Sequence, residues 1–318
     1  MLSIVTLFDH HYAARGLVML ESLARHYSMP FEATALCMTP EAHRIVSALG
    51  TPSVRALSVE HIDDPELLAL RGGRPHREFC WTATPALLRH ALRRAAPGDT
   101  VAYLDADLMF FADPRQLLRE LDDHDILIHE HRYAPDRMAW RRASGTFNVG
   151  LVAVRPSEQG HACLERWRRQ CLEKCELDPE HGYCGDQGYL DEWPGRYDRL
   201  RILGHIGGGV APWNVGQYMV TRGRHGPMVN GVPVVFYHYH ALRVVDVKWP
   251  LGLIAEPAEG YRFPRSVREL IYRPYVRALR RQQRAISSAI GAQPRIEMKR
   301  PARAIVKGLA TGALVTAR

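Results

Sequence analysis

The sequence lacks three features that would each define a broad class of protein. Its six cysteines include no CxxC pair, so neither a zinc ribbon nor a thiol redox motif is indicated. No apolar run approaches the roughly 20 residues needed to cross a bilayer. Residues 1–11 lack the basic region, the apolar stretch and the cleavage site of a secretion signal. We therefore expect a folded cytoplasmic protein with reduced thiols.

Charge is unevenly distributed along the chain, whose formal net charge is +8. Residues 261–318 contain 14 Lys or Arg and 2 Asp or Glu, a net charge of +12, so the remaining 260 residues carry −4. A basic tail on a mildly acidic body argues against a nucleic-acid groove. It favours an accessory segment that meets phosphates or an anionic membrane surface at the inner face of the membrane.

The tail also places apolar residues among its arginines at near-helical spacing. These residues are Val267, Leu270, Ile271, Tyr275 and Leu279. Two interpretations stay open. The segment lies on a membrane as an amphipathic helix, or it folds back against the body as far as residue 281.

Apolar patterning predicts alternating strands and helices. Strands are expected at residues 2–8, 31–38, 53–59, 101–104, 126–129, 150–154 and 232–239. Helices are expected at residues 15–26, 40–49, within 65–94 and at 163–176. The βαβαβ order of the first sixty residues is typical of a parallel sheet flanked by helices. Such sheets bind nucleotides at the carboxyl ends of their strands.

Two acidic residues follow the apolar run at 101–104. Asp105 and Asp107 flank Ala106, so on an extended backbone both carboxylates point to the same side. Mg²⁺ and Mn²⁺ prefer carboxylate and phosphate oxygens, so the pair is suited to hold a cation that also binds a diphosphate. A phosphatase with Asp105 as nucleophile is the alternative, although Met109 departs from that pattern.

Five segments occur in the order seen in retaining glycosyltransferases of family 8, the glycogenin and lipopolysaccharide galactosyltransferase type. They are TLFDHHY at 6–12, REFCWT at 77–82, FNVG at 147–150, GDQG at 185–188 and VFYHYHA at 235–241. The chain resembles this family over roughly residues 3–245, and it is also similar to uncharacterised bacterial proteins of glycosyltransferase type. The resemblance implies a GT-A fold, with a mixed, mostly parallel sheet flanked by helices, and transfer with retention of anomeric configuration.

The resemblance also implies a donor site at the loop after the first strand. Thr6, Asp9 and Tyr12 would hold the base and ribose, with Tyr12 stacking on the base. Arg77 would pair with the diphosphate of the donor. Asp105 is also expected to bind the donor. Each has a structural alternative: packing for Tyr12, helix capping for Asp9 and a solvated charge for Arg77.

Three further residues resemble the family's catalytic positions. Asn148 would contact the donor sugar, because an amide can both donate to and accept from hydroxyl groups. Asp186 would bond the sugar or approach the anomeric carbon as the candidate nucleophile, with Gln187 orienting beside it. Helix capping is the alternative for Asp186.

The resemblance gives Asp105 and Asp107 a third metal ligand, His238. His240 is its competitor, because it points to the same side of the strand at period 2. Ala241 stands where the family has Gly. The family's Lys-Pro-Trp is missing at its usual distance, which leaves Arg243 or Lys248 as replacements.

These observations predict a domain of residues 1–256, with a nucleotide-binding half (1–111), an acceptor-binding half (112–256) and a basic helical or partly disordered tail (257–318). Trp213 and Asn214 are candidate acceptor contacts, with core packing as the alternative. We expect Mn²⁺- or Mg²⁺-dependent transfer of a sugar from a nucleotide-diphosphate sugar, UDP favoured, to a glycan or lipid-linked acceptor, as in bacterial cell-surface polysaccharide synthesis. A phosphatase-like hydrolase and a non-catalytic sugar-nucleotide- or glycan-binding protein stay open, as do the base, the sugar and the oligomeric state.

Overall fold

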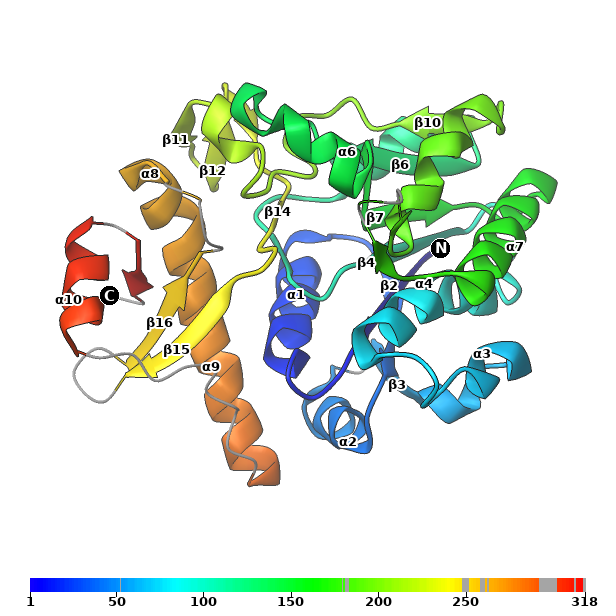
Figure 1. Ribbon diagram of the computed structural model, residues 1–318, viewed down its shortest axis with the longest axis horizontal. Helices are drawn as coiled ribbons and strands as arrows, with labels where there is room; N and C mark the ends of the chain where they lie inside the picture. The colour runs from blue at the N-terminus through cyan, green and yellow to red at the C-terminus, as the bar shows by residue number, and fades with distance from the viewer. Residues whose placement is uncertain are drawn as a thin grey trace.

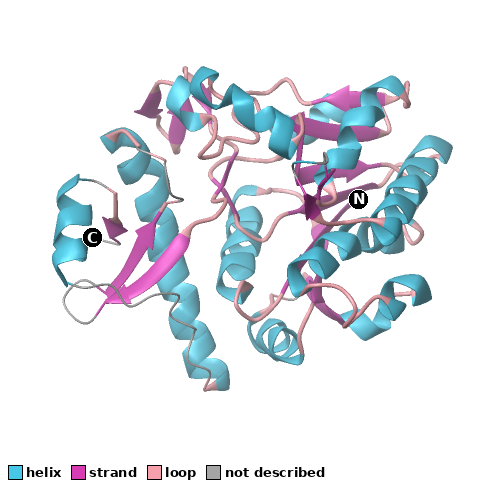
Figure 2. Ribbon diagram, viewed as in Figure 1, coloured by secondary structure: helices cyan, strands magenta, loops and turns pink. Residues whose placement is uncertain are grey.

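The computed structural model describes residues 1–51, 53–178, 180, 183–247, 252–257, 261, 263–291, 302–311 and 313–316. Its centre is a mixed, mostly parallel sheet of seven strands with helices on both faces (Figures 1 and 2). In spatial order the strands are β10 (Leu200–Ile202), β6 (Ile126–Glu130), β7 (Phe147–Val154), β4 (Thr100–Leu104), β1 (Leu2–Phe8), β2 (Phe31–Cys37) and β3 (Val54–Ser58). β7 runs antiparallel to both of its neighbours, whereas the other pairs in this sheet are parallel.

The first sixty residues form the expected βαβαβ unit, with helices α1 (Ala13–His26) and α2 (Pro40–Leu49) between the strands. Thr39 begins α2, because its hydroxyl accepts a hydrogen bond from the Ala42 amide at 3.3 Å and Pro40 occupies the first helical turn. β1 is buried along almost its whole length because helices cover both faces of the sheet.

Side chains of β1 alternate between two cores. Ile4 packs in one cluster with α1, whereas Val5 packs in the other with helices α4 (His76–Leu92) and α7 (Glu158–Glu173). Trp167 of α7 is fully buried in this second cluster. The carboxyl ends of β1 and β4 are thereby held rigidly between two layers of helices.

Several elements differ from the predicted ones, and three of these differences have a clear cause. The helical region 65–94 is two helices, α3 (Pro65–Ala69) and α4, because Gly72, Gly73 and Pro75 interrupt it. α7 begins five residues before the predicted start, where the Ser157 hydroxyl accepts a hydrogen bond from the Gly160 amide at 3.0 Å. The predicted strand 232–239 is broken after Pro233, which has no amide hydrogen to donate.

That break creates two short strands. β13 (Val232–Pro233) joins a hairpin sheet with β12 (Pro227–Val229) and β11 (Val220–Arg222), and β14 (Phe236–His238) pairs antiparallel with β5 (Leu108–Phe110). The smaller remaining elements are α5 (Arg115–Leu118), α6 (Arg141–Ser144), β8 (Leu177–Asp178), β9 (Tyr183–Cys184) and the 3₁₀ helices η1 (Val59–His61), η2 (Arg119–Leu121), η3 (Pro135–Trp140), η5 (Gln187–Gly195) and η6 (Val215–Gln217).

The basic C-terminal region docks against the body. α8 (Arg265–Val267), a π-helical turn (Arg268–Tyr272) and α9 (Arg273–Ile290) follow one another, and α9 runs beside α1 and α2 (Figure 1). Val267, Ile271, Tyr275 and Leu279 are at most 1% exposed. The expectation that this apolar stripe lies on a membrane is therefore wrong, because the protein core already covers it. The docking interpretation is confirmed for the described helix.

Beside α9 lies another antiparallel sheet of β15 (Arg243–Val247), β16 (Gly252–Glu256) and β17 (Val315–Thr316), with α10 (Ala302–Thr311) next to it (Figure 1). Among the described residues, no helix is long and apolar enough to span a membrane.

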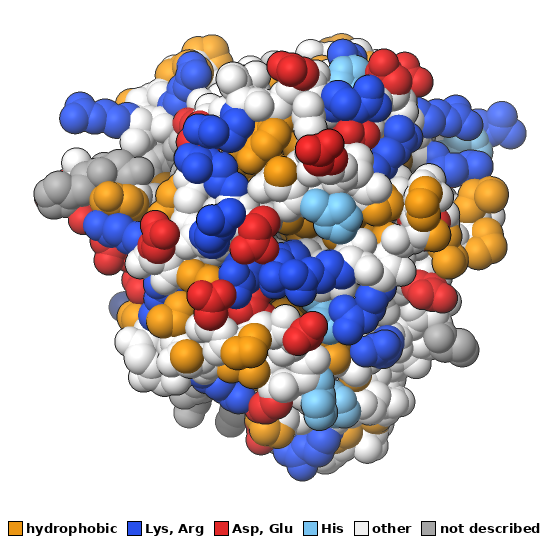
Figure 3. All heavy atoms as spheres, turned by 90° about the vertical axis from the view of Figure 1, so that its right-hand side faces the viewer, with side chains coloured by type: hydrophobic (Ala, Val, Ile, Leu, Met, Phe, Trp, Pro, Cys, Tyr) orange, Lys and Arg blue, Asp and Glu red, His pale blue; other side chains and the backbone are white. Residues whose placement is uncertain are grey.

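Figure 3 shows the side of the molecule that carries α3 and α7, where acidic and basic side chains are intermixed. An ion-pair network, largely buried, joins the helices on this side. Arg168 of α7 contacts Asp64 and Glu66, at 2.6 Å each, and Arg89 of α4 contacts Glu165 at 2.7 Å. The network ties α3, α4 and α7 together and leaves no field of a single sign there.

Candidate active site

A cavity of about 680 Å³ opens at the carboxyl ends of β1 and β4. This volume is in the range of pockets that hold small-molecule ligands and cofactors. Its walls come from the loop after β1, the first turns of α4, the acidic loop between β4 and β5, the segment between β6 and β7, the loop before η5 and the end of β14. Parts of the chain more than 200 residues apart therefore meet at one place.

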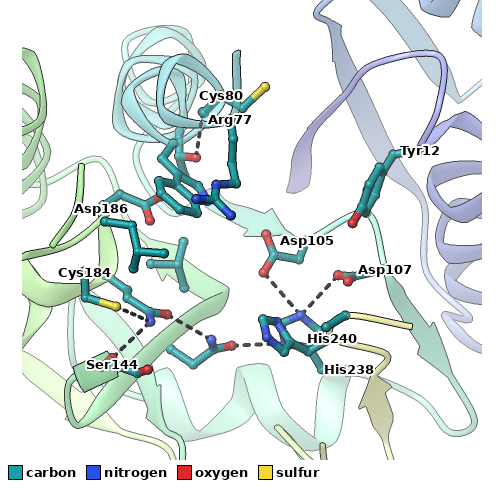
Figure 4. A pocket seen from close by; sticks show the side chains of 18 of the residues that line it. Tyr12, Arg77, Cys80, Asp105, Asp107, Ser144, Cys184, Asp186, His238 and His240 are labelled. Carbon is teal, nitrogen blue, oxygen red and sulfur yellow. Dashed lines mark hydrogen bonds and ion pairs between the residues drawn. The ribbon is translucent and has the colours of Figure 1, made fainter. Parts of the chain in front are cut away.

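The two acids of the DxD motif lie on the floor of this cavity. Asp105 follows β4 and accepts a hydrogen bond from the Tyr103 hydroxyl at 2.9 Å. Asp107 directly precedes β5, and pairing of β5 with β14 sets His238 opposite Leu108. The Nε2 atom of His238 consequently lies 3.1 Å from the Asp107 carboxylate and 3.7 Å from that of Asp105 (Figure 4).

Ligand atoms of Asp105, Asp107 and His238 all lie within 4.8 Å of one another. Burial raises the pKa of Asp105, and the neighbouring Asp107 adds to this effect. Burial acts on Asp107 in the same direction, but the charge and the hydrogen bond of His238 hold its pKa below the usual value. The charge of Asp107 in turn raises the pKa of His238 against the effect of burial. Without a cation the site therefore favours an ion pair between His238 and Asp107.

A buried amide fixes the orientation of the His238 ring. The Asn148 side-chain oxygen lies 3.2 Å from His238 Nδ1 and also accepts from the Gly150 amide at 3.0 Å. Its nitrogen donates to Gln187 Oε1 at 3.2 Å. These partners define which end of the amide is the oxygen, and they turn Nε2 of His238 toward the carboxylates.

Gly150 is required by this arrangement. A Cβ atom there would lie 2.6 Å from Asn148 Oδ1 and 3.1 Å from His238 Nδ1. Since both ends of the Asn148 amide are engaged by protein groups, the structure gives Asn148 an orienting position, and its contact with a donor sugar stays a prediction.

In the sequence Tyr237-His238-Tyr239, the side chain of His238 lines the cavity, whereas the two tyrosine side chains contact the C-terminal helical region. The Tyr237 hydroxyl lies 3.0 Å from the Tyr272 hydroxyl. The ring of Tyr239 stacks on that of Tyr275, with centroids 3.6 Å apart and planes at 5°. The C-terminal region therefore supports the strand that presents His238, which the expectation of an accessory tail did not include.

Tyr12 and Arg77, two of the predicted donor-binding residues, border the cavity. Tyr12 is 41% exposed, and the guanidinium of Arg15 lies 4.2 Å from the centroid of its ring. Arg77 stacks over Trp81 of the next helical turn, at 4.9 Å, and its guanidinium points into the cavity (Figure 4). Both side chains are thus placed to meet a ligand in the cavity.

Asp9 and Thr6 are placed differently. One carboxylate oxygen of Asp9 accepts from the backbone amides of His11 and Tyr12, at 2.9 and 3.0 Å, and the other lies 3.1 Å from His76 Nε2. Asp9 therefore stabilises the turn before α1 and is not its cap, because the cap position is Tyr12, and the Asp9 side chain also lines the cavity. Thr6 is fully buried within β1 and is not among the residues of the cavity wall.

Asp186 lies in the wall beneath α4. Burial, with a contribution from the Asp105 charge, raises its pKa to about 8, and a hydrogen bond from Thr84 opposes the rise. Sequence reasoning missed Thr84 and Tyr103, which surround these acids. Thr84 had a usable signal, because residues 77, 81 and 84 share one face of a helix.

The Gly-rich segment places its aromatic residue inside the protein. Trp213 lines the cavity but is only 4% exposed, and its indole donates to the His131 carbonyl at 2.8 Å. Asn214 is fully buried, donates to the same carbonyl and does not line the cavity. Core packing, the alternative given for Trp213, thus describes both side chains well.

His240 also lines the cavity, but the metal-binding group found among the described residues contains His238. Ala241 has a φ of 52°, a left-handed conformation that favours the glycine of the resembled family. Arg243 begins β15, and Lys248 lies outside the described residues.

Comparison with known proteins agrees with this geometry. Residues 87–192 match a family model described as nucleotide-diphospho-sugar transferase. The uncharacterised proteins YfnF and YfnD of Bacillus subtilis (strain 168) are 30% and 28% identical to the chain. Their alignments cover 67% and 89% of this chain and 72% and 90% of the relatives.

A solved structure of the galactosyltransferase LgtC, in complex with donor and acceptor sugar analogs, has the same fold. It superposes with a TM-score of 0.51 at 17% identity and covers 96% of this chain and 99% of that one. The chain belongs to one family with YfnF, it has a GT-A fold, and it is a glycosyltransferase in which residues 87–192 match the nucleotide-diphospho-sugar transferase model.

Proposed function

We propose that this glycosyltransferase moves a sugar from a nucleotide-diphosphate sugar, UDP favoured, to a glycan or lipid-linked acceptor, with the retention that the family 8 resemblance implies. The observation that carries the proposal is the cluster of Asp105, Asp107 and His238 on the floor of the cavity. A phosphatase-like hydrolase or a non-catalytic binding protein would share the acids, but the family match and the fold are those of sugar transferases.

The donor set fits a divalent cation. Two carboxylates and one imidazole, the latter oriented by Asn148, match the ligand preferences of Mn²⁺ and, less well, of Mg²⁺. The side chains of Asp107 and His238 are 13% and 4% exposed, so the attraction between them is poorly screened by water. When bound, the cation would neutralise negative charge on the diphosphate leaving group.

The surrounding residues supply the remaining parts of the site in this proposal. Tyr12 stacks on the base, and Arg77 pairs with the diphosphate as a planar, permanently charged fork. Asp186 and Gln187 face the sugar. With a pKa raised to about 8, Asp186 carries a proton near pH 7 in the metal-free protein and acts first as a hydrogen-bonding group. A nucleophilic role for Asp186 requires its deprotonated form. That form is favoured only if the bound cation offsets the negative charge of Asp105, which contributes to the raised pKa of Asp186.

The division into a nucleotide-binding half (1–111), an acceptor-binding half (112–256) and a tail remains part of the proposal. Peripheral contact with an anionic membrane is also proposed, now through exposed basic side chains of α9 such as Arg277 and Arg284 and not through its apolar stripe.

The test is a donor panel with and without Mn²⁺. UDP-, GDP-, ADP- and dTDP-sugars are added to the protein, and thermal shift and release of nucleoside diphosphate are measured. A donor at 100 times its Kd stabilises the fold by about 2.7 kcal/mol. Asp107→Ala should abolish the Mn²⁺-dependent part of both signals, because the residue lies past the strand end and holds the cation.

Asp123→Ala is the matched control, since this side chain is 78% exposed and remote from the acidic cluster in the chain. Unchanged donor binding in Asp107→Ala, measured by calorimetry with Mn²⁺, contradicts the metal assignment. Release of phosphate from a phosphomonoester without sugar transfer supports the hydrolase, and binding without turnover supports the non-catalytic alternative.

A further inference from the structure

The cavity extends well beyond the acidic cluster on the side away from Tyr12. Figure 4 shows Tyr12 on one side of Asp105 and Asp107, and Ser144 and Cys184 on the other. The wall on this second side continues to Tyr133, Trp140, Leu177 and Tyr261. If the nucleotide lies over Tyr12, this second side is where the other substrate has room.

Trp140 offers an exposed aromatic ring on this second side. It ends η3, lines the cavity and keeps 38% of its surface exposed. Among the residues that the structure describes, eight large hydrophobic side chains are exposed, and three of them, Tyr12, Trp140 and Leu177, line the same cavity. Exposed apolar surface concentrated in a pocket indicates a binding surface, because contact between water and apolar side chains is unfavourable until a ligand covers them.

The Trp140 ring is held in place before any ligand binds. Its centroid lies 5.6 Å from that of Tyr261, edge to face at 71°. The guanidinium of Arg137 lies 4.9 Å from the Trp140 centroid and 5.1 Å from the Tyr261 centroid. Two cation–π contacts on one guanidinium fix both rings, which lowers the entropy lost when a ligand stacks on them.

The segment that carries Trp140 is cationic. Residues 135–144 (PDRMAWRRAS) contain three arginines and one aspartate, a net charge of +2 in ten residues. Arg141 and Arg142 form the first turn of α6 between the cavity residues Trp140 and Ser144, and both are exposed. Arg141 Nε donates to Thr146 Oγ1 at 3.1 Å, which fixes its side chain. Neither arginine is among the residues of the cavity wall, so both lie beside the cavity, next to Trp140 in the chain.

We propose that this rim, defined by Trp140, Tyr261, Arg141 and Arg142, is the acceptor subsite and that the acceptor is an anionic glycan. A sugar ring lays its C–H face on Trp140, and a phosphate or carboxylate on that ring or its neighbour pairs with the arginines. The inference rests on the proposed function and specifies its acceptor class.

This binding serves transfer of the donor sugar to a hydroxyl group of the acceptor. An acceptor hydroxyl oxygen forms a bond to the anomeric carbon of the donor sugar, and the bond from that carbon to the phosphate oxygen breaks. The departing nucleoside diphosphate keeps the electron pair of the broken bond. The hydroxyl proton passes to the diphosphate or to water.

The experiment compares matched probes that differ in charge. Acceptor binding to the Mn²⁺- and donor-loaded protein is measured by saturation-transfer NMR for p-nitrophenyl glucoside against p-nitrophenyl glucuronide, and for methyl glucoside against glucose 1-phosphate. We expect each charged probe to bind at least fivefold more tightly than its neutral counterpart at 50 mM salt, with the difference shrinking at 300 mM. The two pairs separate a carboxylate from a phosphate as the recognised group.

Variants assign the effect to residues. Trp140→Ala should weaken all four probes about tenfold while Trp140→Phe retains most of the affinity. Arg141→Gln with Arg142→Gln should weaken only the charged probes, and Arg222→Gln, an exposed arginine on β11, should change nothing. In every variant, Mn²⁺-dependent release of nucleoside diphosphate without acceptor should stay within twofold of the parent.

The outcomes separate the two proposals. Absence of donor binding and of nucleoside diphosphate release in the parent protein contradicts the proposed function itself. With donor chemistry intact, the acceptor proposal is overturned if no charged probe binds more tightly than its neutral partner. It is also overturned if Trp140→Ala leaves every probe unaffected.

Discussion

The C-terminal helix is expected to control metal binding through one aromatic contact. Tyr275 of α9 stacks on Tyr239 at 3.6 Å, and Tyr239 directly follows His238. Both tyrosines are fully buried. Tyr239 also donates its backbone amide to the Asp107 carbonyl at 2.9 Å, so its position is linked to the acidic loop. Tyr275→Ala removes the surface against which this segment rests.

The size of the effect follows from the contacts. Replacing a buried aromatic residue by alanine typically costs about 3–5 kcal/mol of the free energy of unfolding. A stacked pair contributes about 0.5–1.5 kcal/mol beyond the buried area, and this part is specific to Tyr239. If that energy holds His238 in its binding orientation, its loss weakens Mn²⁺ binding about tenfold, since about 1.4 kcal/mol is one factor of ten.

Two other variants make the result interpretable. Tyr275→Phe keeps the stack and removes a hydroxyl that has no hydrogen-bond partner among the described residues, so stability and Mn²⁺ affinity should be maintained or rise slightly. Ile286→Ala creates a cavity in the same helix, about 16 Å further along its axis, and should destabilise the fold without changing Mn²⁺ affinity.

The assay combines urea unfolding with calorimetric Mn²⁺ titration at a temperature where all variants are folded. The reasoning is refuted if Tyr275→Ala binds Mn²⁺ as tightly as Tyr275→Phe. It is equally refuted if Ile286→Ala loses as much Mn²⁺ affinity as Tyr275→Ala at a similar loss of stability.

Four further predictions concern the site itself. His238→Ala should weaken Mn²⁺ binding more than His240→Ala, and a calorimetric titration with the reverse order would make His240 the ligand. Gly150→Ala should reduce Mn²⁺ affinity about tenfold in the same titration, because its Cβ would displace the amide that orients His238; unchanged affinity would count against that orienting contact. In the metal-free protein, burial and a neighbouring carboxylate raise the pKa of Asp186 to about 8, so the stability that this side chain contributes at low pH is lost as the pH rises from about 4 to about 8. The stability of Asp186→Asn relative to the parent, measured by urea unfolding, should therefore rise by up to about 1.4 kcal/mol per pH unit over that range. If the free energies of unfolding of the two proteins change in parallel with pH, the raised pKa of Asp186 is contradicted. Ala241→Gly should stabilise the fold by about 1 kcal/mol in the same assay, because the left-handed backbone there has a φ of 52°, whereas a loss of stability would show that the conformation is unstrained.

The sequence alone was sufficient for the local elements and for the chemical class. Strand β1 and helix α2 have the predicted bounds, because apolar periodicity and a capping residue act over a few residues. The order of the five motifs indicated a sugar-nucleotide transferase, which the family match and the fold confirm. The acids of the DxD motif were identifiable because a buried strand delivers them to a loop.

Only the tertiary structure decided which distant residues cooperate. His238 reaches the DxD acids because β14 pairs with β5, a long-range pairing for which neither strand carries a local signal. The rim at Trp140 includes Tyr261, which lies beyond the boundary predicted at residue 256. The apolar stripe of α9 has the same spacing whether it faces lipid or protein, since periodicity records only that one side is apolar. In the folded protein the apolar stripe of α9 packs against α1, α2 and the end of the strand that presents His238, and these elements form one buried apolar cluster with it.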